Sequence, residues 1–193
     1  MCLVRSDDDA ALIDGCRAGD RRCLERVLRR EAPALLALLV RLVGPRADAD
    51  DLLQRSLEAA VRAFPSFRGE ASVRTWLTRI AVRVAMHELS RPRRDRVGLE
   101  LVTGLGSEAP VESVIMARQQ LHRVHEHLAS LPVKQRVAFV LHVIDGRPVQ
   151  DVAALMSATQ TATKSRIFLA RRALFRRAER DPVLRELMEG STP

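Results

Sequence analysis

The sequence is poor in aromatic residues: among 193 residues there are no tyrosines, one tryptophan and five phenylalanines. Proteins that bind single-stranded nucleic acid on a stacking platform place several aromatic side chains on one surface. The composition therefore argues against such a platform.

Cysteines are also few. Cys2, Cys16 and Cys23 all lie near the N-terminus and have no CxxC spacing. This argues against a disulfide framework and against a structural zinc site, and it favours a reducing cytoplasm. A redox pair of Cys16 and Cys23 is the alternative, but we expect buried thiols.

Long apolar segments are absent as well. The longest apolar run, residues 32–40, contains Pro33 and is shorter than the roughly 20 residues that a membrane-spanning helix needs. The acidic start at Asp7 to Asp9 is unlike a signal peptide. We therefore expect no targeting segment and no membrane insertion.

The motifs of common catalytic sites are missing too. The sequence has no phosphate-binding glycine loop, nucleophile elbow or H-E-x-x-H motif. His122 and His125 share a helical face, and His127 is close, but no cysteine or second cluster near them completes a tetrahedral metal site. We expect no catalytic residues, no metal and no cofactor, and therefore no enzyme.

Positive charge, in contrast, is abundant. The formal net charge of +8 favours an anionic partner, either nucleic acid or an acidic protein surface. With 47% hydrophobic residues the chain can build the core of one medium domain or two small ones. Apolar residues recur at helical spacing and no strand pattern is evident, so the predicted fold class is all-α.

Three helices are predicted in the N-terminal half after a short first one. The first of the three begins near Asp20, is kinked or restarted at Pro33, and ends at Gly44. The second, residues 48–63, starts with acidic residues, which a helix N-terminus favours. The third follows a turn-rich loop and is capped by Ser72.

The third helix has two different faces. Trp76 lies within an apolar stripe, so we interpret it as a core anchor rather than a stacking residue. Arg79, Arg83 and His87 lie along another face, and an arginine cluster follows at residues 91–96. Loop and basic helix together predict a nucleic-acid surface, with a solvated basic face as the alternative. The apolar stripe consists of Val73, Trp76, Leu77, Ile80 and Val84.

The C-terminal half follows a linker, residues 97–113, which has three glycines and no sustained periodicity. Helices are predicted over 114–128 and 133–144. Pro148 then opens a short helix, and a tight turn at Ser157 leads to a helix with a basic outer face. This pattern is typical of a helix-turn-helix, with a generic helical hairpin as the alternative. Residues expected to face inward are Val137, Val140, Leu141 and Ile144, then Thr163, Ile167, Ala170 and Leu174.

Four stretches occur in a fixed order between Asp9 and Arg180. They are Ala18-Gly19-Asp20; Asp48-Ala49-Asp50-Asp51-Leu52-Leu53-Gln54; Phe67-Arg68-Gly69-Glu70-Ala71-Ser72 with Thr75-Trp76-Leu77 and Ile80-Ala81; and Leu131-Pro132 with Gln135-Arg136, Phe139, Leu141, Gly146, Asp151-Val152-Ala153 and Lys164-Ser165-Arg166. In this order, and interrupted by the linker, they resemble the extracytoplasmic-function (ECF) sigma factors of the sigma-70 superfamily. These are bacterial transcription initiation factors.

The resemblance implies a division of labour along the chain. Residues 1–96 would form an N-terminal domain that binds the clamp of core RNA polymerase and recognises and melts the proximal promoter element. After the linker at 97–113, residues 114–180 would contact the polymerase flap and read the distal promoter element through the helix-turn-helix, and residues 181–193 would form a tail. An anti-sigma factor is a further implied partner, and the expected location is the bacterial cytoplasm.

The resemblance also implies individual contacts. Expected at the polymerase are Asp48, Asp50, Asp51 and Gln54. Expected at the proximal element, where a loop accepts a base whose unstacking costs about a few kcal/mol, are Ser66, Phe67, Arg68, Arg74, Arg79, Arg83 and His87. Expected at the distal element are Gln160, Thr161, Lys164 and Ser165 for base edges and Arg166, Arg171 and Arg172 for phosphates.

The sequence departs from the family pattern at some of these positions. Arg83 replaces a usual asparagine, and His87 replaces a usual acid, so the proximal sequence preference is not transferred. Ser157 replaces the turn glycine, at a cost of ~1 kcal/mol if φ is positive, and Thr161-Ala162-Thr163 replaces Gly-Thr-Val. Two alternatives therefore stay open: a helix-turn-helix regulator that acts without core polymerase, and a diverged sigma-like protein that titrates polymerase or an anti-sigma factor.

Overall fold

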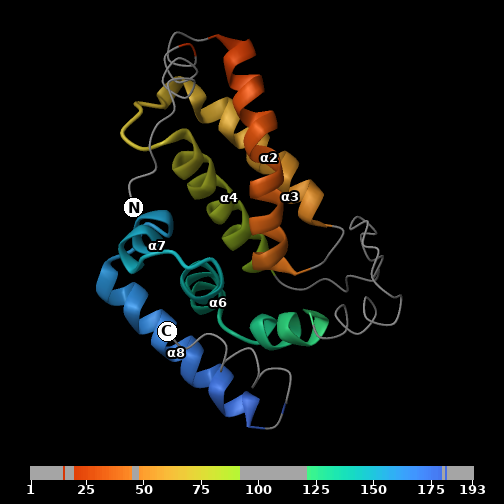
Figure 1. The fold of residues 1–193 in the computed structure, drawn as a ribbon, viewed down its shortest axis with the longest axis vertical. Coiled ribbons are helices and arrows are strands. Elements are labelled where there is room, and N and C mark those ends of the chain that lie inside the picture. Colours follow the sequence, from red (N-terminus) through yellow and green to blue (C-terminus); the bar gives the residue numbers. More distant parts are fainter. Residues whose placement is uncertain (1–14, 16–19, 45–47, 92–120, 180, 182–193) are drawn as a thin grey trace.

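The computed structural model describes residue 15, residues 20–44, 48–91 and 121–179, and residue 181. Within these ranges all regular elements are helical, as predicted (Figure 1). The N-terminal half contains α2 (Arg21–Val43), α3 (Asp48–Ala63), the 3-10 turn η1 (Phe64–Ser66) and α4 (Val73–Leu89). The C-terminal half contains a helix at residues 121–129, α6 (Val133–Phe139), the π-helical turn η2 (Val140–Ile144), α7 (Val149–Leu155) and α8 (Gln160–Ala178).

Helix α2 begins and ends where predicted. The backbone N–H of Arg22 donates to the Asp20 carboxylate at 2.8 Å, and this hydrogen bond is the main reason that the pKa of Asp20 lies below its ordinary value. Gly44 ends the helix with φ of 96°. The expected restart at Pro33 was wrong, because α2 continues through it. Burial of one apolar stripe on both sides of Pro33 outweighs the cost of about 3 kcal/mol for an internal proline.

Helices α2, α3 and α4 pack against one another and form the N-terminal module (Figure 1). Their amphipathic faces meet in one apolar core, which is why helices with many polar residues are stable together. Fully buried side chains of this core are Leu39, Leu42, Leu52, Leu77 and Val82.

The C-terminal module is built around α8, which packs against α6 and α7 (Figure 1). Its core includes Val137, Leu141 and Leu174, as predicted. Ile144 was expected to face inward and is instead 39% exposed. The π-helical turn explains the difference: the N–H of Asp145 donates to the carbonyl of Val140 at 2.9 Å, and the wider turn changes which side chains face the core.

The two modules are in contact. Helix α4 packs against α6 and α7 (Figure 1), and Arg41 Nε lies 2.6 Å from Asp145 Oδ1. At the end of α2, a Cβ atom on Gly44 would lie 3.5 Å from the ring of His125. The described residues of both halves therefore form one body.

Several expectations lie outside the described residues: the first helix, the linker at 97–113, the start of the helix predicted from 114, and most of the tail after 180. None of the described helices combines the length and apolarity needed to cross a membrane.

Candidate nucleic-acid interface

The loop between α3 and α4 is fixed by three aromatic rings. The ring centroids of Phe67 and Trp76 lie 5.1 Å apart, and Phe64 lies 6.1 Å from each of them. All three are half-buried and pack against the core, which confirms the prediction that Trp76 is a core anchor. Aromatic pairs at such distances add about 0.5–1.5 kcal/mol beyond the area they bury.

Local hydrogen bonds hold the rest of this loop. Ser66 Oγ donates to the carbonyl of Ala63 at 2.7 Å, Gly69 has φ of 70°, and the N–H of Thr75 donates to Ser72 Oγ at 3.1 Å. The capping role predicted for Ser72 is therefore confirmed. Ser66 and Arg68 remain exposed on this ordered loop.

Helix α4 divides its basic residues between two sides. Arg79, Arg83 and His87 follow one another at every fourth position, so they lie on one face; Arg83 and His87 are exposed and Arg79 is half-buried. The Nε atom of Arg79 is buried and has no hydrogen-bond partner among the described residues. Because a helix turns about 100° per residue, Arg74 lies on the side opposite Arg83.

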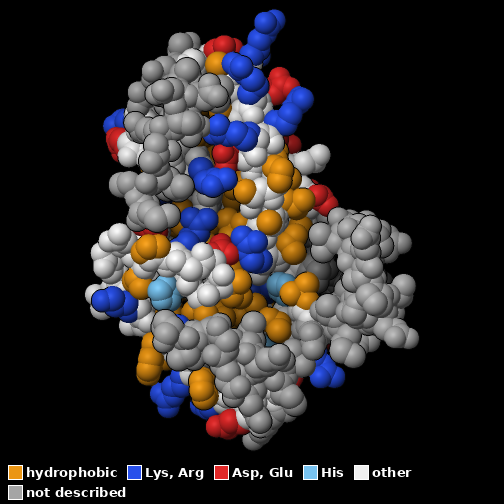
Figure 2. Space-filling view, viewed as in Figure 1, with side chains coloured by type: hydrophobic (Ala, Val, Ile, Leu, Met, Phe, Trp, Pro, Cys, Tyr) orange, Lys and Arg blue, Asp and Glu red, His pale blue; other side chains and the backbone are white. Residues whose placement is uncertain are grey.

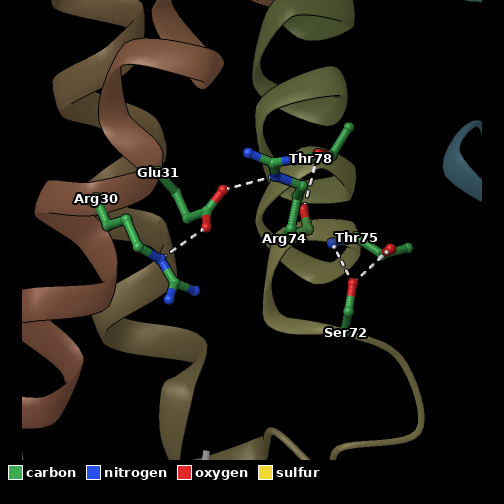
Figure 3. Close-up of polar contacts among 6 residues, drawn as sticks. All are labelled: Arg30, Glu31, Ser72, Arg74, Thr75 and Thr78. Carbon is green, nitrogen blue, oxygen red and sulfur yellow. Dashed lines mark hydrogen bonds and ion pairs between the residues drawn. The ribbon is translucent and has the colours of Figure 1, made fainter. Parts of the chain in front are cut away.

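Arg74 contacts α2 instead (Figure 3). Its Nε atom lies 2.8 Å from Glu31 Oε2, and Arg30 Nε lies 3.1 Å from Glu31 Oε1. The Glu31 side chain is only 6% exposed, and a buried carboxylate is stable only when cations and hydrogen bonds compensate it. Sequence analysis missed Glu31. Its position could have indicated the contact: it lies four residues after the inward Val27, and an acid on an apolar stripe needs a cation nearby.

The polar face of α3 was expected to meet the polymerase. Asp50, Asp51 and Gln54 are all exposed on it, while the side chain of Asp48 lies outside the described residues. Asp51 is 3.5 Å from Arg55. A stronger bond joins Arg55 to the buried Glu88 of α4 at 3.0 Å, and this hydrogen bond raises the pKa of Arg55 above its ordinary value.

Helices α7 and α8 have the arrangement of a helix-turn-helix. Ser157 in the turn has φ of 51°, so the turn requires the left-handed conformation, as the missing glycine suggested. Thr159 caps α8 by accepting a hydrogen bond from the N–H of Ala162 at 3.2 Å. Thr163 is fully buried, and its hydroxyl donates to the carbonyl of Thr159 at 2.9 Å.

The outer face of α8 carries the residues expected at the distal element. Arg166 is half-buried. Exposed members of the predicted set are Gln160, Thr161, Lys164, Ser165, Arg171 and Arg172. Sequence analysis missed Phe168 and Phe175, which are 63% and 61% exposed on the same helix. Their place outside the inward stripe is the signal that could have found them.

The three histidines do not converge. His122 lies 3.5 Å from Glu126, His127 lies 2.8 Å from Asp181, and the ring of His125 lies near Gly44. No group of three or more metal-ligating side chains was found among the residues that the structure describes.

Comparisons with known proteins decide the family. Residues 27–95 match the family described as Sigma-70 region 2, and residues 121–174 match Sigma-70, region 4. The chain is 30% identical over 194 residues to the RNA polymerase sigma-H factor of Pseudomonas aeruginosa, covering 95% of this chain and 100% of that protein. It is 31% identical over 176 residues to the ECF RNA polymerase sigma-E factor of Salmonella typhimurium, covering 86% and 92%. The chain belongs to the ECF sigma factors.

This sigma factor also resembles solved structures. CnrH, in complex with the cytosolic domain of CnrY, is 27% identical and superimposes with a TM-score of 0.67, covering 91% of this chain and 99% of CnrH. The sigma factor RpoE, in complex with the anti-sigma factor NepR from Bartonella quintana, is 24% identical with a TM-score of 0.54, covering 86% and 96%, and shares the fold.

Family membership gives the two modules their names. Region 2 includes most of α2 and all of α3 and α4, and region 4 runs from the helix at 121–129 into α8. As an ECF sigma factor the protein is a transcription initiation factor, which confirms the family and the fold class expected from the sequence.

Proposed function

We propose that this sigma factor binds core RNA polymerase through α3 and directs it to promoters, with region 2 reading the proximal element and region 4 the distal one. The observation that carries the proposal is that this ECF sigma factor has an exposed acidic face on α3 and exposed basic faces on α4 and α8. Its role requires no catalytic chemistry of its own, and it acts in the cytoplasm, where the polymerase is.

The acidic face of α3 is the proposed contact to the polymerase clamp. Asp50, Asp51 and Gln54 are exposed along it, and the proposed contact also includes Asp48, which the family resemblance implies. The Arg55–Glu88 contact supports this role, because it holds α3 against α4 at the base of the acidic face. Such a surface attracts basic groups of a partner, and this attraction weakens as salt increases.

The loop and the Arg79 face of α4 form the proposed proximal-element site. Ser66, Phe67 and Arg68 would border the pocket for the extruded base, whose unstacking costs about a few kcal/mol. Arg79, Arg83 and His87 would follow the strand, and the exposed Arg83 would bind its phosphates.

Helix α8 is the proposed reader of the distal element. Its N-terminal residues reach base edges when such a helix lies in the major groove; here these are Gln160, Thr161, Lys164 and Ser165. Arg166, Arg171 and Arg172 would bind phosphates and position the helix without reading sequence. Region 4 would also contact the polymerase flap.

An anti-sigma factor is the proposed regulator. The two solved relatives are each in complex with another protein, the cytosolic domain of CnrY and the anti-sigma factor NepR. The basic and partly apolar outer faces of this chain are compatible with a partner that covers them.

Transcription with purified core polymerase on a genomic promoter library tests the proposal. We expect start-site-specific transcripts that depend on the sigma factor, weaker core binding for Asp50→Lys/Asp51→Lys, and weaker distal-element dependence for Lys164→Ala. The matched control is Glu126→Lys, which changes a 66% exposed acid on the helix at residues 121–129, outside α3. Specific duplex binding without core binding would instead indicate a helix-turn-helix regulator, and core binding without transcripts would indicate a titrating protein.

A further inference from the structure

The N-terminal half of α2 carries an unusual concentration of arginines. Figure 2 shows Lys and Arg side chains along this part of α2 and onward between α2 and α4. A helix N-terminus favours negative side chains, so arginines in the first turns are unfavourable for the isolated helix. Local rules are most often broken where a surface has a function. The exposed arginines of this half-helix are Arg21, Arg22, Arg26, Arg29 and Arg30.

Neighbouring acids compensate only part of this charge. Glu25 pairs with Arg29 at 2.8 Å, Asp20 caps the helix, and Glu31 is shared by Arg30 and Arg74. With Arg74 included, the described residues of this surface comprise six arginines and three carboxylates, so positive charge predominates among them.

Glu31 is the organising residue (Figure 3). Its carboxylate accepts hydrogen bonds from the Nε–H groups of Arg30 on α2 and Arg74 on α4, at 3.1 Å and 2.8 Å. The two arginine side chains remain 46% and 59% exposed, whereas the glutamate side chain is 6% exposed. Because both Nε–H groups bind the same carboxylate, the orientation of each guanidinium is restricted, which is the preorganisation that an oxyanion site needs.

We propose that Arg30 and Arg74, aligned by the buried Glu31, form a binding site for the phosphate backbone of promoter DNA that continues along α2. The inference rests on the proposed function, because it requires that region 2 bind DNA. It adds a surface on the side of α4 opposite Arg83, and it assigns Glu31 as a positioning residue and Arg22, Arg26 and Arg30 as phosphate contacts.

DNA fits this surface better than an acidic protein does. Arg22, Arg26 and Arg30 recur at every fourth residue, so successive guanidinium groups advance by about 6 Å along one side of the helix. A regular row of this kind matches a polyanion with regularly repeated charges. Contacts of this type add affinity without sequence preference and are sensitive to salt.

Salt-dependent DNA binding by the holoenzyme tests the proposal. The full chain is assembled with core polymerase, and its affinity for a fluorescent promoter fragment is measured over a series of KCl concentrations. For Arg30→Gln/Arg74→Gln we expect the slope of log affinity against log salt to become shallower by about one to two, since each phosphate contact contributes about 0.9. Arg62→Gln on α3, which removes a 71% exposed arginine, is the control and should leave the slope unchanged.

The Glu31→Gln variant distinguishes the positioning of the two guanidinium groups from the effect of net charge on DNA binding. This variant raises the net positive charge by one, so a surface that acts by charge alone would bind DNA more tightly. We expect weaker binding and a shallower salt slope, because a glutamine side chain offers one acceptor oxygen instead of two, so one of the two guanidinium groups loses its partner. Thermal unfolding and core affinity are measured for each variant, so that loss of fold is recognised.

Three outcomes would overturn the inference. They are an unchanged slope for the double variant, tighter DNA binding by the folded Glu31→Gln variant, and a loss of core affinity with an unchanged DNA slope, which would assign the surface to the polymerase. If wild-type holoenzyme produces no promoter-specific transcript, the proposed function itself fails, and this result is distinct from the other three.

Discussion

At the scale of single residues, Ser157 in the turn of the helix-turn-helix has a backbone conformation that is unfavourable for a residue with a side chain. Ser157 is the one non-glycine residue with positive φ among the residues described, at 51°. A residue with a Cβ atom is strained in this conformation, whereas glycine is not. The unusual backbone was accessible to sequence analysis because the family has glycine at this turn.

We predict that Ser157→Gly stabilises the protein by about 1 kcal/mol, because glycine adopts the left-handed conformation without strain. Thermal and urea unfolding measure the difference. Ser130→Gly serves as the control, since Ser130 is not among the residues with positive φ, and it should give no gain. Equal or lower stability of Ser157→Gly would show that the turn is relaxed.

Thr163 is a second residue whose role is decided by a single hydrogen bond. Its hydroxyl donates to the Thr159 carbonyl, which also accepts the N–H of Thr163 at 3.0 Å. We predict that Thr163→Val changes stability by less than about 1 kcal/mol, because the carbonyl keeps one donor and the methyl group fits an apolar site. Thr163→Ala, which leaves a cavity, should cost more in the same urea titration.

At the scale of elements, helix α4 is attached to its neighbours by a buried carboxylate at each end. Glu31 of α2 holds Arg74 near its start, and Glu88 near its end holds Arg55 of α3. The bounds of α3 and α4 could be predicted because caps, periodicity and turn residues are local in the sequence. The two carboxylate contacts could not, because they join residues 43 and 33 positions apart.

We predict that Glu88→Gln destabilises region 2 by about 1–3 kcal/mol, because the buried Arg55 contact loses its charge-assisted hydrogen bond. Chemical unfolding of the full chain measures this loss. Glu58→Gln, which changes a 64% exposed partner of Arg62, should cost less than about 0.5 kcal/mol. Similar effects of the two substitutions would contradict the role assigned to Glu88.

At the scale of the whole molecule, regions 2 and 4 are joined by an ion pair as well as by packed helices. Asp145 follows the π-helical turn, and its side chain, which is 7% exposed, reaches Arg41 of α2, 104 positions away in the sequence. Sequence analysis assigned each region its helices but had no signal for this contact, because no local pattern specifies how two modules dock. The π-helical turn was also not predicted. The sequence analysis assumed regular α-helical periodicity, and for this reason it placed Ile144 in the core.

We predict that Arg41→Met weakens the docking of region 4 on region 2, because it removes the ion pair and leaves the Asp145 carboxylate with Arg147 at 3.7 Å. Small-angle scattering should show a larger radius of gyration for the isolated variant, with unchanged helical content by circular dichroism. Arg62→Met is the matched control. An unchanged radius would mean that apolar contacts of α4 with α6 and α7 suffice for docking.

The aromatic cluster of the region 2 loop has a practical consequence. The chain has one tryptophan and no tyrosine, so its ultraviolet emission reports almost entirely on Trp76, which touches Phe64 and Phe67 beside the loop. The isolated sigma factor therefore carries an intrinsic fluorophore at the place where an extruded base is proposed to bind. Quenching of this emission by single-stranded promoter DNA would follow loop occupancy in real time, without a label.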